Sequence, residues 1–151
     1  MPEIRTAVTI PAPPATVWAD VRDVASHVEW MADAEAIRFT SDRTEGVGTT
    51  FECDTRMGPF RLTDLMEITE WVETERMGVR HVGIVTGTGV FTLEPLGEPD
   101  EPVATVFTWT EELSFPWWMG GPIGATAARP VMSWIWRRNL KRLKTRVAAS
   151  V

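Results

Sequence analysis

The C-terminal stretch from Pro122 to Ala149 constrains the fold of this 151-residue chain more than any other segment. Its large apolar residues recur at spacings of four, four, three and four, which places them on one stripe of a helix that turns about 100° per residue. The opposite side and the last turns carry basic residues, as expected of a solvated helix face. The sequence therefore predicts a long helix with one buried face, made of Met132, Trp136, Leu140, Leu143 and Val147.

Two prolines predict the details of this helix. Pro122 follows Gly120 and Gly121 and suits the first helical position, where a missing N–H leaves no bond unmade. Pro130 lies inside the pattern, where it should kink the helix or split it. We therefore expect a short leading piece and a long main piece.

The beginning of the chain predicts one strand and two short helices. Ile4–Ile10 alternates apolar and polar residues and is typical of a half-buried strand, which ends at a group of prolines. Ala15–Val21 has apolar residues at helical spacing, with Pro14 placed to begin the helix. Val24–Met31 shows a second helical pattern.

From Glu35 onward the pattern changes to a period of two, which indicates an antiparallel meander of five or six strands. Turn-forming residues separate the segments. Together with the first strand they predict a sheet of six or seven strands. The segments are Glu35–Ser41, Thr49–Met57, Phe60–Trp71, Arg76–Val82, Thr86–Pro95 and Val103–Leu113.

This order of elements predicts an α+β fold in which a curved antiparallel sheet wraps around the long C-terminal helix and leaves a cavity between them. Such an arrangement is a helix-grip architecture. The length is that of one ordinary domain, so residues 1–151 are expected to form a single domain around this cavity.

Composition excludes several classes of protein. No apolar run approaches the roughly 20 residues of a membrane-spanning helix, and the first residues lack the layout of a secretory signal, so we expect a cytoplasmic protein without an integral membrane segment. Cys53 stands alone, and it makes no metal-ligand pattern with His27 and His81, so no metal is expected. The glycine pairs Gly87/Gly89 and Gly120/Gly121 match no phosphate-binding loop; we expect no cofactor and interpret them as points of curvature and a hinge.

Charge is distributed unevenly along the chain. Residues 1–112 contain all 21 acidic side chains and eight bases, whereas residues 113–151 contain seven bases and no acid. The acidic total disfavours nucleic acid as a partner. We interpret the basic helix as a solvated face that complements the acidic part of the chain; a docking face for anionic lipid or an acidic partner is the alternative.

Nearly the whole chain resembles the START-like, or SRPBCC, superfamily, in particular its polyketide cyclase/dehydrase-like branch. The resemblance is carried by IPAPPATVWADVRDVASHVEWM near the start, GVGTTFECDTRMGPFRLTDLMEITEW in the middle, and TVFTWTEELSFP followed by the helix ending LKRLKTRV. It implies a helix-grip fold around a cavity for a hydrophobic molecule. None of these segments is a catalytic motif, so the resemblance speaks for the fold more than for the function.

Strand alternation predicts which side chains face the helix and thus the cavity. The inward phase contains the apolar residues Phe51, Cys53, Met57, Phe60, Leu62, Met66, Ile68, Met77, Val79, Phe91, Leu93, Val103, Phe107, Trp109 and Leu113.

Three ionisable residues share this inward phase: Asp64, His81 and Glu111. If a hairpin pairs Trp71 with Arg76, Met66 lies opposite His81, and Asp64 becomes a diagonal neighbour of His81 at about 7 to 8 Å. The sequence therefore predicts an Asp and a His on one wall of the cavity.

Three functions remain open. The first is binding of a small hydrophobic molecule, of the lipid or aromatic polyketide type, with the polar trio orienting the ligand. The second is a polyketide cyclase- or dehydratase-like enzyme that uses His81 with Asp64 or Glu111 as acid and base. For the first function the predicted ligand-binding residues are Phe51, Cys53, Asp64, Met66, His81, Phe91, Trp109, Glu111, Met132 and Trp136.

The third function is a partner-binding module without catalysis. An exposed apolar patch on Trp117, Trp118 and Trp134 would support it. The same three residues could instead cap the cavity entrance. Both a monomer and a homodimer are compatible with the sequence.

Overall fold

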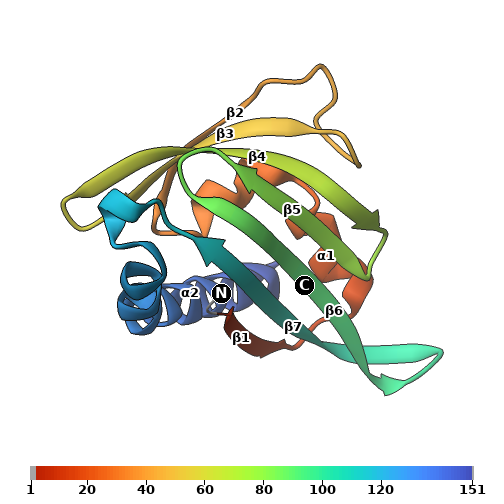
Figure 1. Ribbon diagram of the computed structural model, residues 1–151. Coiled ribbons are helices and arrows are strands. Elements are labelled where there is room, and N and C mark those ends of the chain that lie inside the picture. The colour runs from red at the N-terminus through yellow and green to blue at the C-terminus, as the bar shows by residue number, and fades with distance from the viewer. Residues whose placement is uncertain (1–2, 151) are drawn as a thin grey trace.

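The computed structural model describes residues 3–150. It consists of a seven-stranded antiparallel sheet curved around a C-terminal helix (Figure 1), which confirms the expected α+β helix-grip arrangement. The elements are β1 (Glu3–Ile10), α1 (Pro14–Val21), η1 (Val24–Glu29), β2 (Ala34–Phe39), β3 (Thr50–Met57), β4 (Phe60–Val72), β5 (Arg76–Val82), β6 (Thr86–Glu98), β7 (Glu101–Ser114), η2 (Trp117–Met119) and α2 (Gly121–Ala149).

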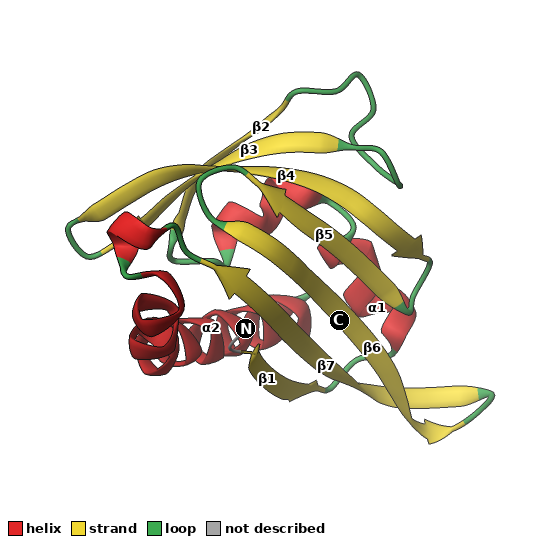
Figure 2. Cartoon of the chain, viewed as in Figure 1, coloured by secondary structure: helices red, strands yellow, loops and turns green. Residues whose placement is uncertain are grey.

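The strands follow the order β1-β7-β6-β5-β4-β3-β2, so the first strand lies beside the last. All other neighbours in the sheet are consecutive in the chain, as expected for a meander. Figure 2 shows the helices on the concave side of the sheet, with α1 near one end of α2. The two short helices after β1 were expected; the second is a 3₁₀-helix.

The long helix buries the stripe that its periodicity predicts. Met132, Trp136, Leu140, Leu143 and Val147 are all buried and belong to one core cluster with the inward face of the sheet. Pro130 does not split the helix into two pieces, because α2 is continuous from Gly121 to Ala149. A proline removes only one backbone hydrogen bond, and packing of the turns on both sides keeps the helix intact.

Register in the sheet differs from the expectation at one hairpin. Trp71 pairs with Met77, not with Arg76. A register shift between Ile68 and Glu70 adds one residue to β4, and beyond this bulge Met66 lies opposite His81 as expected. The error at the turn is therefore compensated before the strand reaches the cavity.

Two residues assigned to the inward face are exposed. Phe60 is 72% exposed at the start of β4, next to the turn at the end of the β3–β4 hairpin. Val103 is 68% exposed and lies near the register shift between β6 and β7, where a bulge interrupts the alternation of side chains. Strand alternation cannot foresee a bulge, which explains the error at Val103. Phe60, although exposed, lines the cavity as the alternation predicts.

Candidate functional site

A cavity of about 620 Å³ lies between the concave face of the sheet and α2. Its wall is mostly apolar and includes six of the seven methionines of the chain. Methionine is flexible and polarisable, so a wall of this kind adapts to apolar molecules of different shape. These residues are Met31, Met57, Met66, Met77, Met119 and Met132.

Exposed side chains on the wall mark where the cavity reaches the surface. The large apolar ones are Phe60 at the β3–β4 hairpin, Ile84 between β5 and β6, and Trp118 in η2, and the exposed Arg61 follows Phe60. Figure 1 shows these three segments near the same end of the sheet, close to the first turns of α2. We therefore place the mouth of the cavity at this end.

The structure brings all ten predicted ligand-binding residues to the cavity wall, although their contact with a ligand stays a prediction. Six come from the sheet strands β3, β4, β5 and β6, two from β7 and two from α2. They are Phe51, Cys53, Asp64, Met66, His81, Phe91, Trp109, Glu111, Met132 and Trp136.

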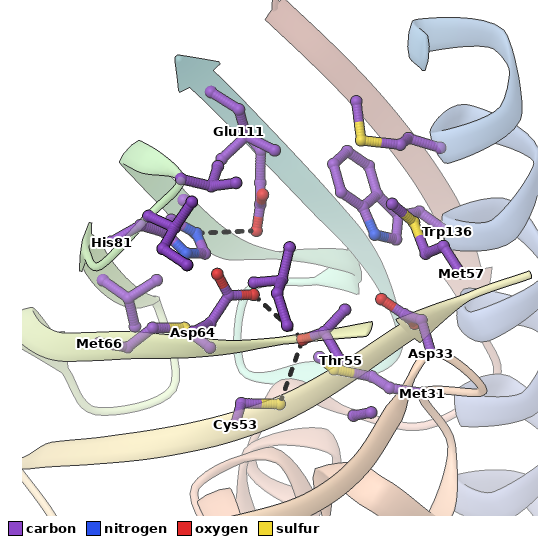
Figure 3. A pocket seen from close by; sticks show the side chains of 18 of the residues that line it. Met31, Asp33, Cys53, Thr55, Met57, Asp64, Met66, His81, Glu111 and Trp136 are labelled. Atoms are coloured by element: carbon purple, nitrogen blue, oxygen red, sulfur yellow. Dashed lines mark hydrogen bonds and ion pairs between the residues drawn. The ribbon is translucent and has the colours of Figure 1, made fainter. Parts of the chain in front are cut away.

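The closest polar contact of His81 in the cavity joins strands that are not neighbours. His81 on β5 and Glu111 on β7 are separated by β6, yet His81 Nε2 lies 3.6 Å from Glu111 Oε1 (Figure 3). The inward position of β6 opposite Glu111 is Gly89. A Cβ atom there would lie 2.9 Å from Glu111 Oε1, so the absence of a side chain leaves the room that the carboxylate occupies.

This pair is buried and strongly polar. His81 is only 7% exposed, and neither ring nitrogen makes a hydrogen bond within the described chain. Burial lowers the pKa of His81, but the carboxylates of Glu111 and Asp64 outweigh it and raise the pKa above its ordinary value. Glu111 also accepts a hydrogen bond of 3.1 Å from Trp109 Nε1. The imidazole therefore keeps unused hydrogen-bonding capacity inside the cavity.

Asp64 approaches the same region from β4. Its Oδ2 accepts a hydrogen bond of 3.0 Å from the Thr55 hydroxyl, while its Oδ1 is buried without a partner among the described residues (Figure 3). Burial is the main reason that the pKa of Asp64 is raised. Cys53 lies nearby, and burial raises the pKa of its thiol to about 12, so the thiol is not a nucleophile at neutral pH.

Asp33 is a buried acidic residue of the cavity that sequence reasoning missed. It lies between η1 and β2, and its Oδ1 accepts a hydrogen bond of 2.8 Å from Asn139 Nδ2 on α2. Burial raises the pKa of Asp33. Asn139 also accepts a hydrogen bond of 2.9 Å from the Ala32 N–H. The available signal was Asn139 itself, a polar residue beside the buried stripe of the helix.

The tryptophans expected near the entrance divide into two groups. Trp118 lines the cavity, whereas Trp117 and Trp134 do not.

The glycines Gly87 and Gly89, interpreted as points of curvature, have a more specific role: Gly87 has a φ of 136° and Gly89 makes room for Glu111. The interpretation of these glycines as points of curvature did not predict that Gly89 makes room for Glu111.

Acidic groups dominate the polar part of the wall. Asp33, Asp64 and Glu111 contribute carboxyl groups, and the one Arg or Lys on the described wall, Arg61, has an exposed side chain. Among the described residues no group of three His, Cys, Asp or Glu side chains could hold a metal ion. No helix within residues 3–150 is long and apolar enough to cross a membrane.

Solved structures with the same fold extend over the whole chain. A protein from Thermus thermophilus, TTHA0849, is 23% identical with a TM-score of 0.79, and 99% of each chain is covered. A START superfamily protein from Mycobacterium smegmatis is 13% identical with a TM-score of 0.77 and 99% coverage of each chain. The Zhui aromatase/cyclase from Streptomyces sp. R1128 is 16% identical with a TM-score of 0.73, covering 97% of this chain and 93% of that one. These likenesses show the fold.

A comparison with curated proteins finds no match. A family model, in contrast, matches residues 1–148, which is nearly the entire chain. Its description is polyketide cyclase / dehydrase and lipid transport. The protein therefore belongs to the polyketide cyclase/dehydrase and lipid transport family.

Proposed function

We propose that this protein binds a small, mostly apolar molecule in the cavity between the sheet and α2. The observation that carries the proposal is an adaptable apolar cavity of about 620 Å³ with a small group of buried polar side chains on one wall. This volume falls within the range of roughly 300 to 1,000 Å³ that is usual for small-molecule sites. The family and the Zhui aromatase/cyclase likeness agree with a lipid or an aromatic polyketide as the ligand.

The polar groups favour a ligand whose polar end donates hydrogen bonds. Asp64 Oδ1 has no partner among the described residues, and Glu111 accepts a hydrogen bond from Trp109 through one of its two oxygens. A buried acceptor without a donor costs about 1 to 3 kcal/mol, which a ligand hydroxyl or N–H group would recover. A carboxylate or sulfonate on the ligand would instead face three carboxyl groups, including Asp33. An uncharged donor therefore fits this wall better than an anion.

Two dyes that differ by one sulfonate test this proposal. We expect N-phenyl-1-naphthylamine to bind with a rise in fluorescence, and 8-anilinonaphthalene-1-sulfonate to bind at least about tenfold more weakly, equivalent to about 1.4 kcal/mol. Titration at neutral pH measures both affinities. The variant Val103→Ser, which does not line the cavity, serves as a control and should bind both dyes like the wild type.

To locate the dye, Ala128→Trp places a large side chain on the cavity wall. Loss of N-phenyl-1-naphthylamine binding in this variant, with an unchanged circular dichroism spectrum, supports binding in the cavity. Unchanged affinity in the Ala128→Trp variant, or failure of the neutral dye to bind the wild type, contradicts the proposed function.

Acid–base catalysis is a second candidate, favoured by the buried pair of His81 and Glu111. Neutral His81 would accept a proton from a carbon next to a carbonyl group, leaving an enolate, and would return the proton to the same carbon. Glu111, at 3.6 Å, would stabilise the imidazolium formed in between. The unpartnered Asp64 oxygen lies on the same wall, where it can orient a protonated ligand group.

Proton exchange in D₂O tests this candidate with 2-tetralone as the probe, because its protons next to the carbonyl are acidic. We expect the wild type to accelerate their replacement by deuterium, followed by NMR, and His81→Gln to reduce the acceleration by about 10²-fold or more. Affinity for the probe should remain within a few-fold. A wild type that does not accelerate exchange rejects catalysis and leaves the binding proposal intact.

A further inference from the structure

The outer face of α2 exposes a row of apolar side chains. Ile123 is 82% exposed, Val131 57% and Trp134 55%. Together with the exposed Ala127 they recur at spacings of four, four and three, which places them on one side of the helix. We call these four residues the outer stripe. Its position is about half a turn away from the buried stripe of Met132 and the residues that follow it.

Basic residues continue the outer stripe toward the C-terminus. Arg138 and Lys141 follow Trp134 at spacings of four and three, and Arg137 lies beside them. The Arg138 guanidinium lies 4.7 Å from the centre of the Trp134 ring. None of these three bases forms an ion pair within the described chain.

Two bases on the other sides of the last turns have internal partners. Arg146 pairs with Asp20 of α1 at 3.0 Å, and Arg142 donates to the Glu29 carbonyl at 3.2 Å. These contacts fit the view of the basic helix as a complement to the acidic part of the chain. The outer stripe and its three bases are not explained by that view, because they have no acidic partner among residues 3–150.

The segment just before α2 adds two exposed tryptophans. Trp117 is 86% exposed and Trp118 60%. Trp118 also lines the cavity, so exposed aromatic surface reaches the mouth of the binding site. In Figure 1, η2 lies beside the first turns of α2, where the outer stripe begins.

We propose that α2 docks on the surface of an anionic lipid bilayer through the outer stripe, with Arg137, Arg138 and Lys141 contacting lipid headgroups. Exposed tryptophan and aliphatic side chains next to unpaired bases are suited to the boundary between headgroups and acyl chains. Residues 113–151 have seven bases and no acid, while all 21 acids lie in residues 1–112. An anionic surface therefore attracts α2 and repels the sheet, which orients the molecule. This docking does not depend on which molecule fills the cavity.

Sedimentation of the full chain with lipid vesicles tests the proposal. We expect binding to vesicles of phosphatidylcholine with about 30 mol% phosphatidylglycerol, weaker binding to phosphatidylcholine alone, and a decrease with added salt. The double variant Ile123→Ser/Trp134→Ser and the charge variant Arg137→Glu/Lys141→Glu should each weaken partitioning by about tenfold or more. Val103→Ser, an equally exposed apolar side chain on the β6–β7 hairpin, should bind like the wild type.

All the altered side chains are exposed, so we expect each variant to keep the fold and the thermal stability of the wild type. Thermal unfolding of each variant measures this. The proposal is overturned if the wild type does not sediment with the anionic vesicles, or if both double variants partition as it does. It is also overturned if light scattering shows a dimer that Ile123→Ser/Trp134→Ser dissociates, because a second copy would then occupy this face.

Discussion

Two single residues determine the chemistry of the cavity, one because it has no side chain and the other because one of its oxygens has no hydrogen-bond partner. Gly89 has no side chain, and for that reason Glu111 can lean across β6 toward His81. Asp64 has a hydrogen-bond partner on one carboxylate oxygen and, within the described chain, none on the other. The cavity thus contains a carboxyl group and an imidazole whose hydrogen bonds are incomplete, and both are available to a ligand.

The buried carboxyl of Asp64 should make stability depend on pH. Its pKa in the folded state is raised above the ordinary value of about 3.9, so the charged form costs stability above that pH and costs nothing below it. Asp64→Asn should therefore raise the free energy of unfolding relative to the wild type near pH 7. The gain should vanish as the pH falls below about 4.

Urea denaturation at a series of pH values measures this difference. Asp54→Asn is the matched control, because Arg38 holds the pKa of Asp54 down at about 2 and the sign is reversed. That variant should lose stability relative to the wild type above about pH 4. A constant effect of Asp64→Asn across the whole pH range would contradict the role assigned to its charge.

At the scale of elements, α2 serves two opposite surfaces. Its buried stripe closes the concave face of the sheet, and Asn139 ties it to the loop before β2 through hydrogen bonds to Ala32 and Asp33. Its outer stripe leaves apolar side chains in solvent. A helix that is apolar on two sides is expected to pack against a neighbour on each side. Within the described chain, α2 packs on one side only.

Substitutions one residue apart separate the two sides of α2. Leu140 is 1% exposed, and Leu140→Ala should reduce the free energy of unfolding by about 2 to 5 kcal/mol through lost burial and the cavity left behind. Lys141 is exposed, and Lys141→Ala should change stability by no more than about 0.5 kcal/mol. Chemical denaturation of both variants checks this. Similar effects of the two substitutions would mean that α2 does not pack on the sheet as described.

Acidic and basic side chains are distributed unevenly over the molecule as a whole. All acidic residues lie in the part of the chain that contains the sheet, and the last 39 residues contain seven bases and no acid. The exposed lining residue Trp118 places the cavity mouth beside η2. Figure 1 shows η2 near the first turns of α2, at one end of the molecule. An apolar cavity that opens beside exposed tryptophans would allow an apolar molecule to pass between a bilayer and the site with little exposure to water.

Local patterns alone determined much of this protein. The stripe from Met132 to Val147 and the alternation of the strands predicted the helix, the sheet and the inward direction of Asp64, His81 and Glu111. These patterns are readable because burial imposes periods of 3.6 and two residues on any helix or strand with one buried face. The order of these elements also predicted the cavity, and the family resemblance added the expectation of a hydrophobic molecule inside it.

Tertiary structure decided what depends on contacts between distant segments. Three features are of this kind: the bulge near Thr69, the approach of Glu111 to His81 across Gly89, and the hydrogen bond from Asn139 to Asp33. Each depends on residues whose separation in the chain does not determine their distance in space. Exposure of Trp134 was also decided there. Helical periodicity defines two faces of α2, but only packing against the sheet determines which apolar side chains remain in solvent.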